Sequence, residues 1–153
     1  MIKRVLICVA IFLPLTLAAQ RSTYKGFPSL IWPKLYDISF TKAADAHGEY
    51  DKPVFSEAAK SLAGKTISIP GYMVPFENGL KSSHFMLSSL PLNACFFCGA
   101  GGPETVIEVD LKKEVTYSEK PIEVRGILKL NDKDPDKMIY VLENAEITGA
   151  PGF

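Results

Sequence analysis

Two cysteines three positions apart are the residues of this chain whose type and spacing could do chemistry. Cys95 and Cys98 are followed by Gly99, in the order Cys-x-x-Cys-Gly. From a tight turn two such thiolates can bind one metal ion, and a glycine after them lets the chain fold back so that backbone N–H groups point at the sulfurs. The motif therefore predicts a site for a thiophilic metal ion, with zinc as the expected cofactor.

Zinc takes four ligands, whereas this motif supplies two. His84 precedes the cysteines in a predicted strand and is the first candidate for an additional ligand, followed by Glu104 and His47. These two histidines are the only ones in the chain, so a Ser-His-Asp hydrolase is not indicated. We expect a protein that is not an enzyme.

Two other interpretations of Cys95 and Cys98 stay open. In thiol–disulfide oxidoreductases a Cys-x-x-Cys pair depends on a helix N-terminus that lowers the pKa of one thiol. Here the glycine-rich stretch after Cys98 leads towards a strand, so this activation is not evident. Alternatively, the cysteines brace a loop of a structural or partner-binding module, although a disulfide closing so small a ring stabilises little.

The elements that position the cysteines are predicted to be mainly strands. The pair lies in a long connection, residues 88–104, and loops of such length in compact domains are often functional. Alternating apolar and polar residues predict strands over 65–74, 83–87, 105–111, 122–130 and 138–147. Pro70-Gly71 and Gly126 indicate bends in two of them, and Asn78-Gly79 indicates a turn.

A short helix is predicted ahead of these strands. Pro53 is expected to open it, an apolar stripe runs from Phe55 to Leu62, and Gly64 stands where a helix ends. One helix and five strands with glycine kinks predict a mainly β fold, a small five-stranded OB-like barrel. A small β-sandwich is the alternative.

The first 19 residues are predicted to be a secretory signal peptide. Lys3 and Arg4 precede an apolar run over 5–17 that is too short to span a bilayer comfortably, and small alanines follow it. We therefore expect an exported protein, periplasmic or secreted, with no transmembrane segment once the signal is removed. The expected organisation is a signal peptide (1–19), an N-terminal arm and linker (20–52), the OB-like domain (53–148) and a C-terminal tail (149–153).

Composition narrows the class of partner. The chain is 47% hydrophobic and 22% charged, which suits a folded domain rather than a disordered one. Its 17 basic and 17 acidic residues balance, and loss of Lys3 and Arg4 with the signal leaves the remainder mildly acidic. A nucleic-acid partner is disfavoured, because binding to phosphates depends on an excess of basic side chains.

A run of motifs resembles a family of bacterial exported proteins of unknown function with an OB-like core. Its most specific part is residues 64–75, GKTISIPGYMVP, accompanied by Pro53-Val54-Phe55, the Phe85-x-Leu87 strand and the cysteine loop. The likeness covers roughly residues 30–148. A Cys/His site of that family corresponds here to Cys95 and, with substitution, to Cys98. The resemblance implies metal handling beside an envelope transport system, with an envelope protein or transporter component as partner.

Overall fold

The computed structural model describes residues 27–45, 48–75, 81–99 and 101–152. The predicted signal peptide, His47 and the predicted turn at Asn78-Gly79 lie outside the described residues. Within the described ranges, no helix has the length and apolar character needed to cross a membrane.

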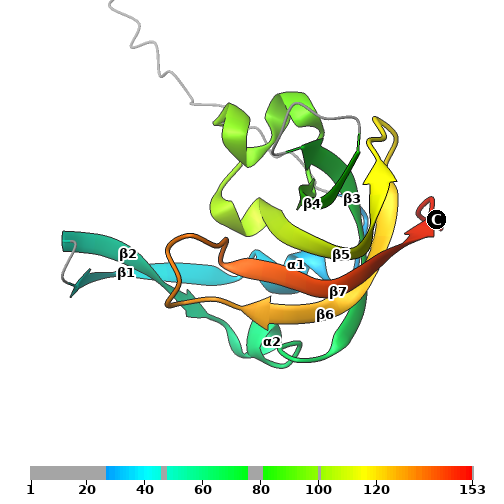
Figure 1. The fold of residues 1–153 in the computed structure, drawn as a ribbon. Helices are drawn as coiled ribbons and strands as arrows, with labels where there is room; N and C mark the ends of the chain where they lie inside the picture. The colour runs from blue at the N-terminus through cyan, green and yellow to red at the C-terminus, as the bar shows by residue number, and fades with distance from the viewer. Residues whose placement is uncertain (1–26, 46–47, 76–80, 100, 153) are drawn as a thin grey trace, which may run out of the picture.

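Five strands close into a barrel (Figure 1). They are β3 (Thr66–Pro75), β4 (Lys81–Ser88), β5 (Val106–Thr116), β6 (Ile122–Leu130) and β7 (Tyr140–Gly149). Around the barrel they follow the order β3-β4-β5-β7-β6, so the last strand inserts between the third and the fourth. β5 and β7 are parallel, and all the other neighbours in the barrel are antiparallel. The predicted class, a mainly β five-stranded OB-like barrel, is confirmed over the sandwich.

The bends predicted at glycines coincide with features of the sheet. β3 is one continuous strand, but it changes partner at Pro70-Gly71: residues 66–71 pair with β6 and residues 72–75 with β4. A Cβ at Gly71 would lie 2.7 Å from both Leu87 Cγ and the Ser88 carbonyl oxygen. A side chain therefore does not fit where β3 crosses from one neighbour to the other. Gly126 likewise stands at a register shift between β6 and β7.

The predicted helix is shorter than expected and begins later. α2 covers Glu57–Lys60, whereas Pro53 lies in strand β2 (Gly48–Phe55) and does not open the helix. Ser56 is the N-cap, since its Oγ accepts a hydrogen bond of 3.2 Å from the Ala59 N–H. The prediction of a start at Pro53 was wrong because proline also fits a two-stranded hairpin, which has no central strand.

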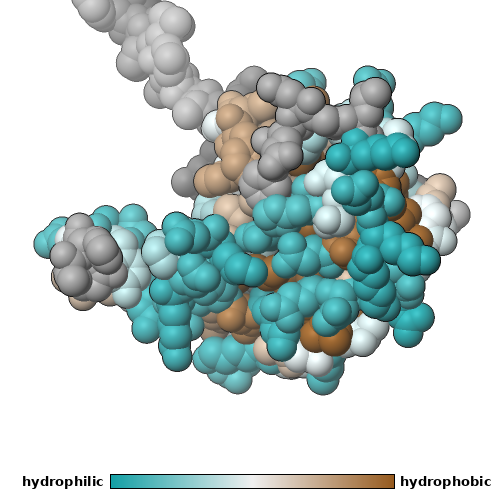
Figure 2. Space-filling model, viewed as in Figure 1, coloured by the Kyte–Doolittle hydropathy of each residue, from teal (hydrophilic) through white to brown (hydrophobic). Residues whose placement is uncertain are grey.

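A hairpin lies largely within the segment expected to be an N-terminal arm and linker, residues 20–52. β1 (Ile38–Asp45) pairs with β2 in antiparallel register, and in Figure 1 the hairpin extends away from the barrel. Figure 2 shows mainly hydrophilic side chains over it. Both faces of its outer part are exposed, so no apolar alternation reveals these strands in the sequence.

The segment before the hairpin contributes to the barrel core. α1 (Trp32–Leu35) buries Trp32 and Leu35 completely, in one cluster with Ala59, Leu62 and the inward-facing side chains of the barrel. Trp32 Nε1 donates a hydrogen bond of 2.7 Å to the Pro70 carbonyl oxygen. Tyr140 Oη donates one of 2.8 Å to the Leu35 carbonyl oxygen. The residues around α1 are thus part of the folded unit.

Replacing Trp32 by alanine tests this assignment. We expect Trp32→Ala to lower the free energy of unfolding by about 3–5 kcal/mol, because it empties a large buried volume. The control is Leu30→Ala, whose side chain is 86% exposed and whose loss should change stability by less than about 0.5 kcal/mol. Urea unfolding measures both, and equal effects would show that α1 lies outside the cooperative core.

Candidate metal centre

The connection between β4 and β5, which carries both cysteines, consists largely of three single-turn 3₁₀ helices. These are η1 (Leu92–Ala94), η2 (Phe96–Cys98) and η3 (Pro103–Thr105). The third predicted strand accordingly begins at Val106 rather than at Thr105. Ser89 closes the base of the connection: its N–H and its hydroxyl donate to the Thr105 carbonyl oxygen at 2.9 and 3.1 Å. The cysteine loop is therefore tied together at its two ends.

Helix η2 brings the two cysteine sulfurs together. Cys95 caps this turn and Cys98 ends it, and the Cys98 N–H donates to the Cys95 carbonyl oxygen at 3.0 Å. The two Sγ atoms are 3.7 Å apart, and both thiols are free. Gly99 follows with φ 81°, the left-handed conformation that glycine adopts most easily. The glycine of the motif thus permits the fold-back expected from its position.

The two thiols differ in their surroundings. Cys95 is completely buried, whereas Cys98 is exposed and its Sγ donates to the Leu92 carbonyl oxygen at 3.0 Å. The pKa of Cys98 is raised, first by its hydrogen bond with Cys95, then by desolvation and by electrostatic interaction with Cys95. Without a bound cation, the Cys98 thiol therefore favours its protonated form.

Cys95 belongs to a small apolar cluster on the outer side of the barrel. Along β3 and β4, Met73, Phe85 and Leu87 join the barrel core, while the alternate residues Val74 and Met86 form a separate cluster with Cys95. Met138, in the connection between β6 and β7, packs against the same cluster. We call Val74, Met86, Cys95 and Met138 the outer cluster. It contains one thiol and two thioethers.

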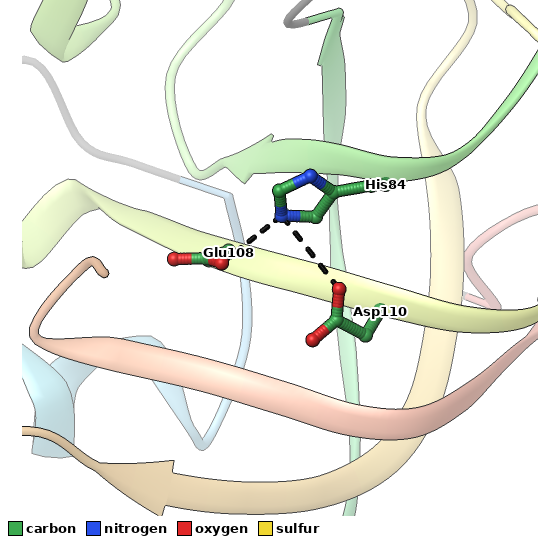
Figure 3. Close-up of side chains that lie close together, drawn as sticks. All are labelled: His84, Glu108 and Asp110. Atoms are coloured by element: carbon green, nitrogen blue, oxygen red, sulfur yellow. Dashed lines mark hydrogen bonds and ion pairs between the residues drawn. The ribbon is translucent and has the colours of Figure 1, made fainter. Parts of the chain in front are cut away.

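A polar group of His84 on β4 with Glu108 and Asp110 on β5 lies on the outer side of the barrel (Figure 3). His84 Nε2 is 3.0 Å from Glu108 Oε1 and 3.6 Å from Asp110 Oδ1. In the β4–β5 register Met86 faces Glu108 and His84 faces Asp110. Glu108 is 4% exposed, and its Oε2 accepts a hydrogen bond of 2.9 Å from the Met138 N–H. This buried carboxylate therefore joins His84 to the segment that brings Met138 to the outer cluster.

The structure places the predicted additional ligands in different surroundings. His84 points to the two carboxylates, two positions along β4 from Met86. Among the described residues, one group of three histidine, cysteine or acidic side chains has ligand atoms close enough to share an ion. It consists of His84, Glu108 and Asp110, and it includes neither cysteine. Glu104 lies in η3, where its charge helps to raise the pKa of Tyr36 and Tyr140, an effect due mainly to burial.

Four residues of this region were not predicted from the sequence. Glu108 and Asp110 alternate with buried apolar residues on β5, which indicates the outer face but not a partner there. Met86 likewise lies between the core residues Phe85 and Leu87 on β4. No local pattern indicates Met138, because the connection that carries it reaches the outer cluster only through the folded barrel.

A separate cavity of about 340 Å³ lies between the β1–β2 hairpin and the β6–β7 connection. Tyr50, Pro53 and Ile139 contribute apolar walls, and Asn131 and Asp132 are among its polar lining residues. Lys52 Nζ, 3.5 Å from Asp132 Oδ2, links the same two segments. None of the predicted site residues within the described chain lines this cavity.

Together these observations define a closed β-barrel domain that carries a pair of free thiols on a surface loop tied at its base. A family model described as a protein of unknown function, DUF3299, matches residues 35–148, and the chain belongs to that family. This agrees with the predicted membership of an uncharacterised family over roughly residues 30–148. No curated protein and no solved structure matches the chain.

The raised pKa of Cys98 gives a test by alkylation. We expect the rate of Cys98 alkylation by iodoacetamide, followed on its peptide by mass spectrometry, to rise at higher pH than for an ordinary thiol. Cys95→Ala should move this rate profile to lower pH, because it removes the main cause of the raised pKa. Asn93→Ala, a change elsewhere on the exposed loop, should leave the profile in place; identical profiles in all three proteins would contradict the coupling.

The carboxylate of Glu108 provides a second test. Glu108→Ala should lower the free energy of unfolding by about 1–3 kcal/mol, because the Met138 N–H loses its acceptor in a partly buried site. Asp110→Ala is the comparison, since its partners are 3.6 and 3.9 Å away and half-exposed, and it should cost less than about 1 kcal/mol. Urea unfolding that gives the same loss for both would refute this role of Glu108.

Proposed function

We propose that this protein is an exported accessory protein that binds a thiophilic metal ion through Cys95 and Cys98. The observation that carries the proposal is the 3.7 Å separation of the two free sulfurs. Tetrahedral zinc with metal–sulfur bonds of about 2.3 Å requires its thiolates to be about 3.8 Å apart. An ion can therefore join this pair with almost no movement of the loop.

The surroundings of the thiols suit an ion that is received and passed on. Cys95 anchors the site within the outer cluster, while the exposed Cys98 is accessible from solvent. Two thiolates leave coordination positions for further ligands, of which His84 is the first candidate and Glu104 the next. Such positions also allow a donor or acceptor protein to share the ion. We propose a component of an envelope transport system as that partner, on the strength of the family resemblance.

A redox function for the same cysteines has less support. A reactive Cys-x-x-Cys thiol needs a lowered pKa, which a helix N-terminus or a neighbouring cation supplies. The pKa of Cys98 is raised instead, and η2 is a single turn of three residues.

The test is the pH dependence of zinc affinity, measured by competition with a chromophoric chelator. Because the ion displaces a proton from each thiol, affinity should rise about a hundredfold per pH unit below the thiol pKa values. Since the pKa of Cys98 is raised, this rise should continue to higher pH than for two ordinary thiols.

The variants separate this site from adventitious binding. Cys98→Ser should weaken zinc binding and reduce the dependence to about tenfold per pH unit, because one thiol remains. Asn93→Ser, an exposed substitution in the same loop, should leave both quantities unchanged. A loss of zinc affinity in His84→Ala would identify His84 as a further ligand. Zinc binding that is equal in the wild-type protein, Cys95→Ser and Cys98→Ser would overturn the proposal.

A further inference from the structure

The outer cluster places two thioethers beside the proposed dithiol site. Met86 is 3% exposed and shares the cluster with Cys95, and Met138 packs against it from another segment. Cys95 in turn lies 3.7 Å, sulfur to sulfur, from Cys98. Cys95 therefore contacts a cluster with two thioethers on one side and the Cys98 thiol on the other.

We propose that this site selects monovalent copper over zinc, with the thioether of Met86 or Met138 completing a coordination shell begun by the two thiolates. The inference rests on the dithiol site proposed above and names the ion that this site prefers. Cu(I) is a soft ion that binds both thiolate and thioether sulfur. Zinc sites use cysteine, histidine and carboxylate ligands instead.

The distribution of harder ligands supports the same preference. His84 Nε2 is already engaged by Glu108 and Asp110, and within the described part of the chain neither cysteine belongs to a group of three histidine, cysteine or acidic side chains. Methionine, by contrast, is flexible enough to move its sulfur towards an ion without moving the backbone. The site therefore offers a third sulfur more readily than a third zinc ligand.

The backbone around Met138 is suited to such a role. Its N–H is fixed by the Glu108 carboxylate at 2.9 Å, so the start of the side chain is held beside the outer cluster. Met86 is held on β4, opposite Glu108. The exposed Cys98 provides the route of entry, while Cys95 and Met86 exclude water from the inner side of the site.

Parallel titrations of Cu(I) and zinc test the inference. Under anaerobic conditions the protein competes with a colorimetric Cu(I) chelator, and in a second series with a zinc chelator. In Met86→Leu/Met138→Leu, Cu(I) affinity should fall at least about tenfold while zinc affinity changes less than about twofold. Met73→Leu is the matched control, because Met73 is 4% exposed but belongs to the barrel core. It should leave both affinities unchanged.

The outcomes distinguish this inference from the proposed function. Unchanged Cu(I) affinity in the double methionine variant would overturn the copper preference and leave the dithiol site standing. If Cys95→Ser and Cys98→Ser bound Cu(I) and zinc with the same affinities as the wild-type protein, the site itself would be overturned. If the double variant fails to fold, X-ray absorption of the wild-type protein loaded with Cu(I) decides: three sulfur ligands support the inference, and two sulfurs with nitrogen or oxygen overturn it.

Discussion

Closure of the five-stranded barrel is the constraint on which the rest of the structure depends. It requires β7 to insert beside β5 in parallel register, with Val109 opposite Leu142. Once the sheet is closed, alternate residues on each strand must face in or out, since side chains along a strand point to opposite faces. Phe85 and Leu87 fill the interior, and His84 and Met86 are committed to the outer side of the same strand.

The outer side of β4 and β5 needs a cover, and the cysteine loop with the β6–β7 connection supplies it. Cys95 rests on Met86, within a cluster that Val74 completes and Met138 flanks. Glu108, buried beside them, holds the Met138 backbone and His84 through its two oxygens. The same contacts that cover apolar surface therefore bring Met86 and Met138 to Cys95, whose partner Cys98 is exposed to solvent. Packing and the proposed metal binding therefore have a common origin.

The sequence predicts the barrel and the thiol pair well, because both are encoded locally. Strand alternation, the glycine bends and the Cys-x-x-Cys-Gly spacing each depend on neighbouring residues. The hairpin was not predicted, since its outer strands are exposed on both faces and carry no apolar period. Met138 and the pairing of His84 with Glu108 depend on contacts between distant segments, so no local signal indicates them. The helix was predicted to begin at Pro53, whereas its N-cap is Ser56. A proline can either begin a helix or lie in a hairpin, so its position alone does not decide between them.

Native mass spectrometry of the metal-loaded protein is the most direct test of the claim that Cys95 and Cys98 together hold a metal ion. The account predicts one ion per chain and protection of both cysteines from alkylation. Absence of a bound ion, or alkylation of Cys98 at the same rate with and without metal, would contradict it.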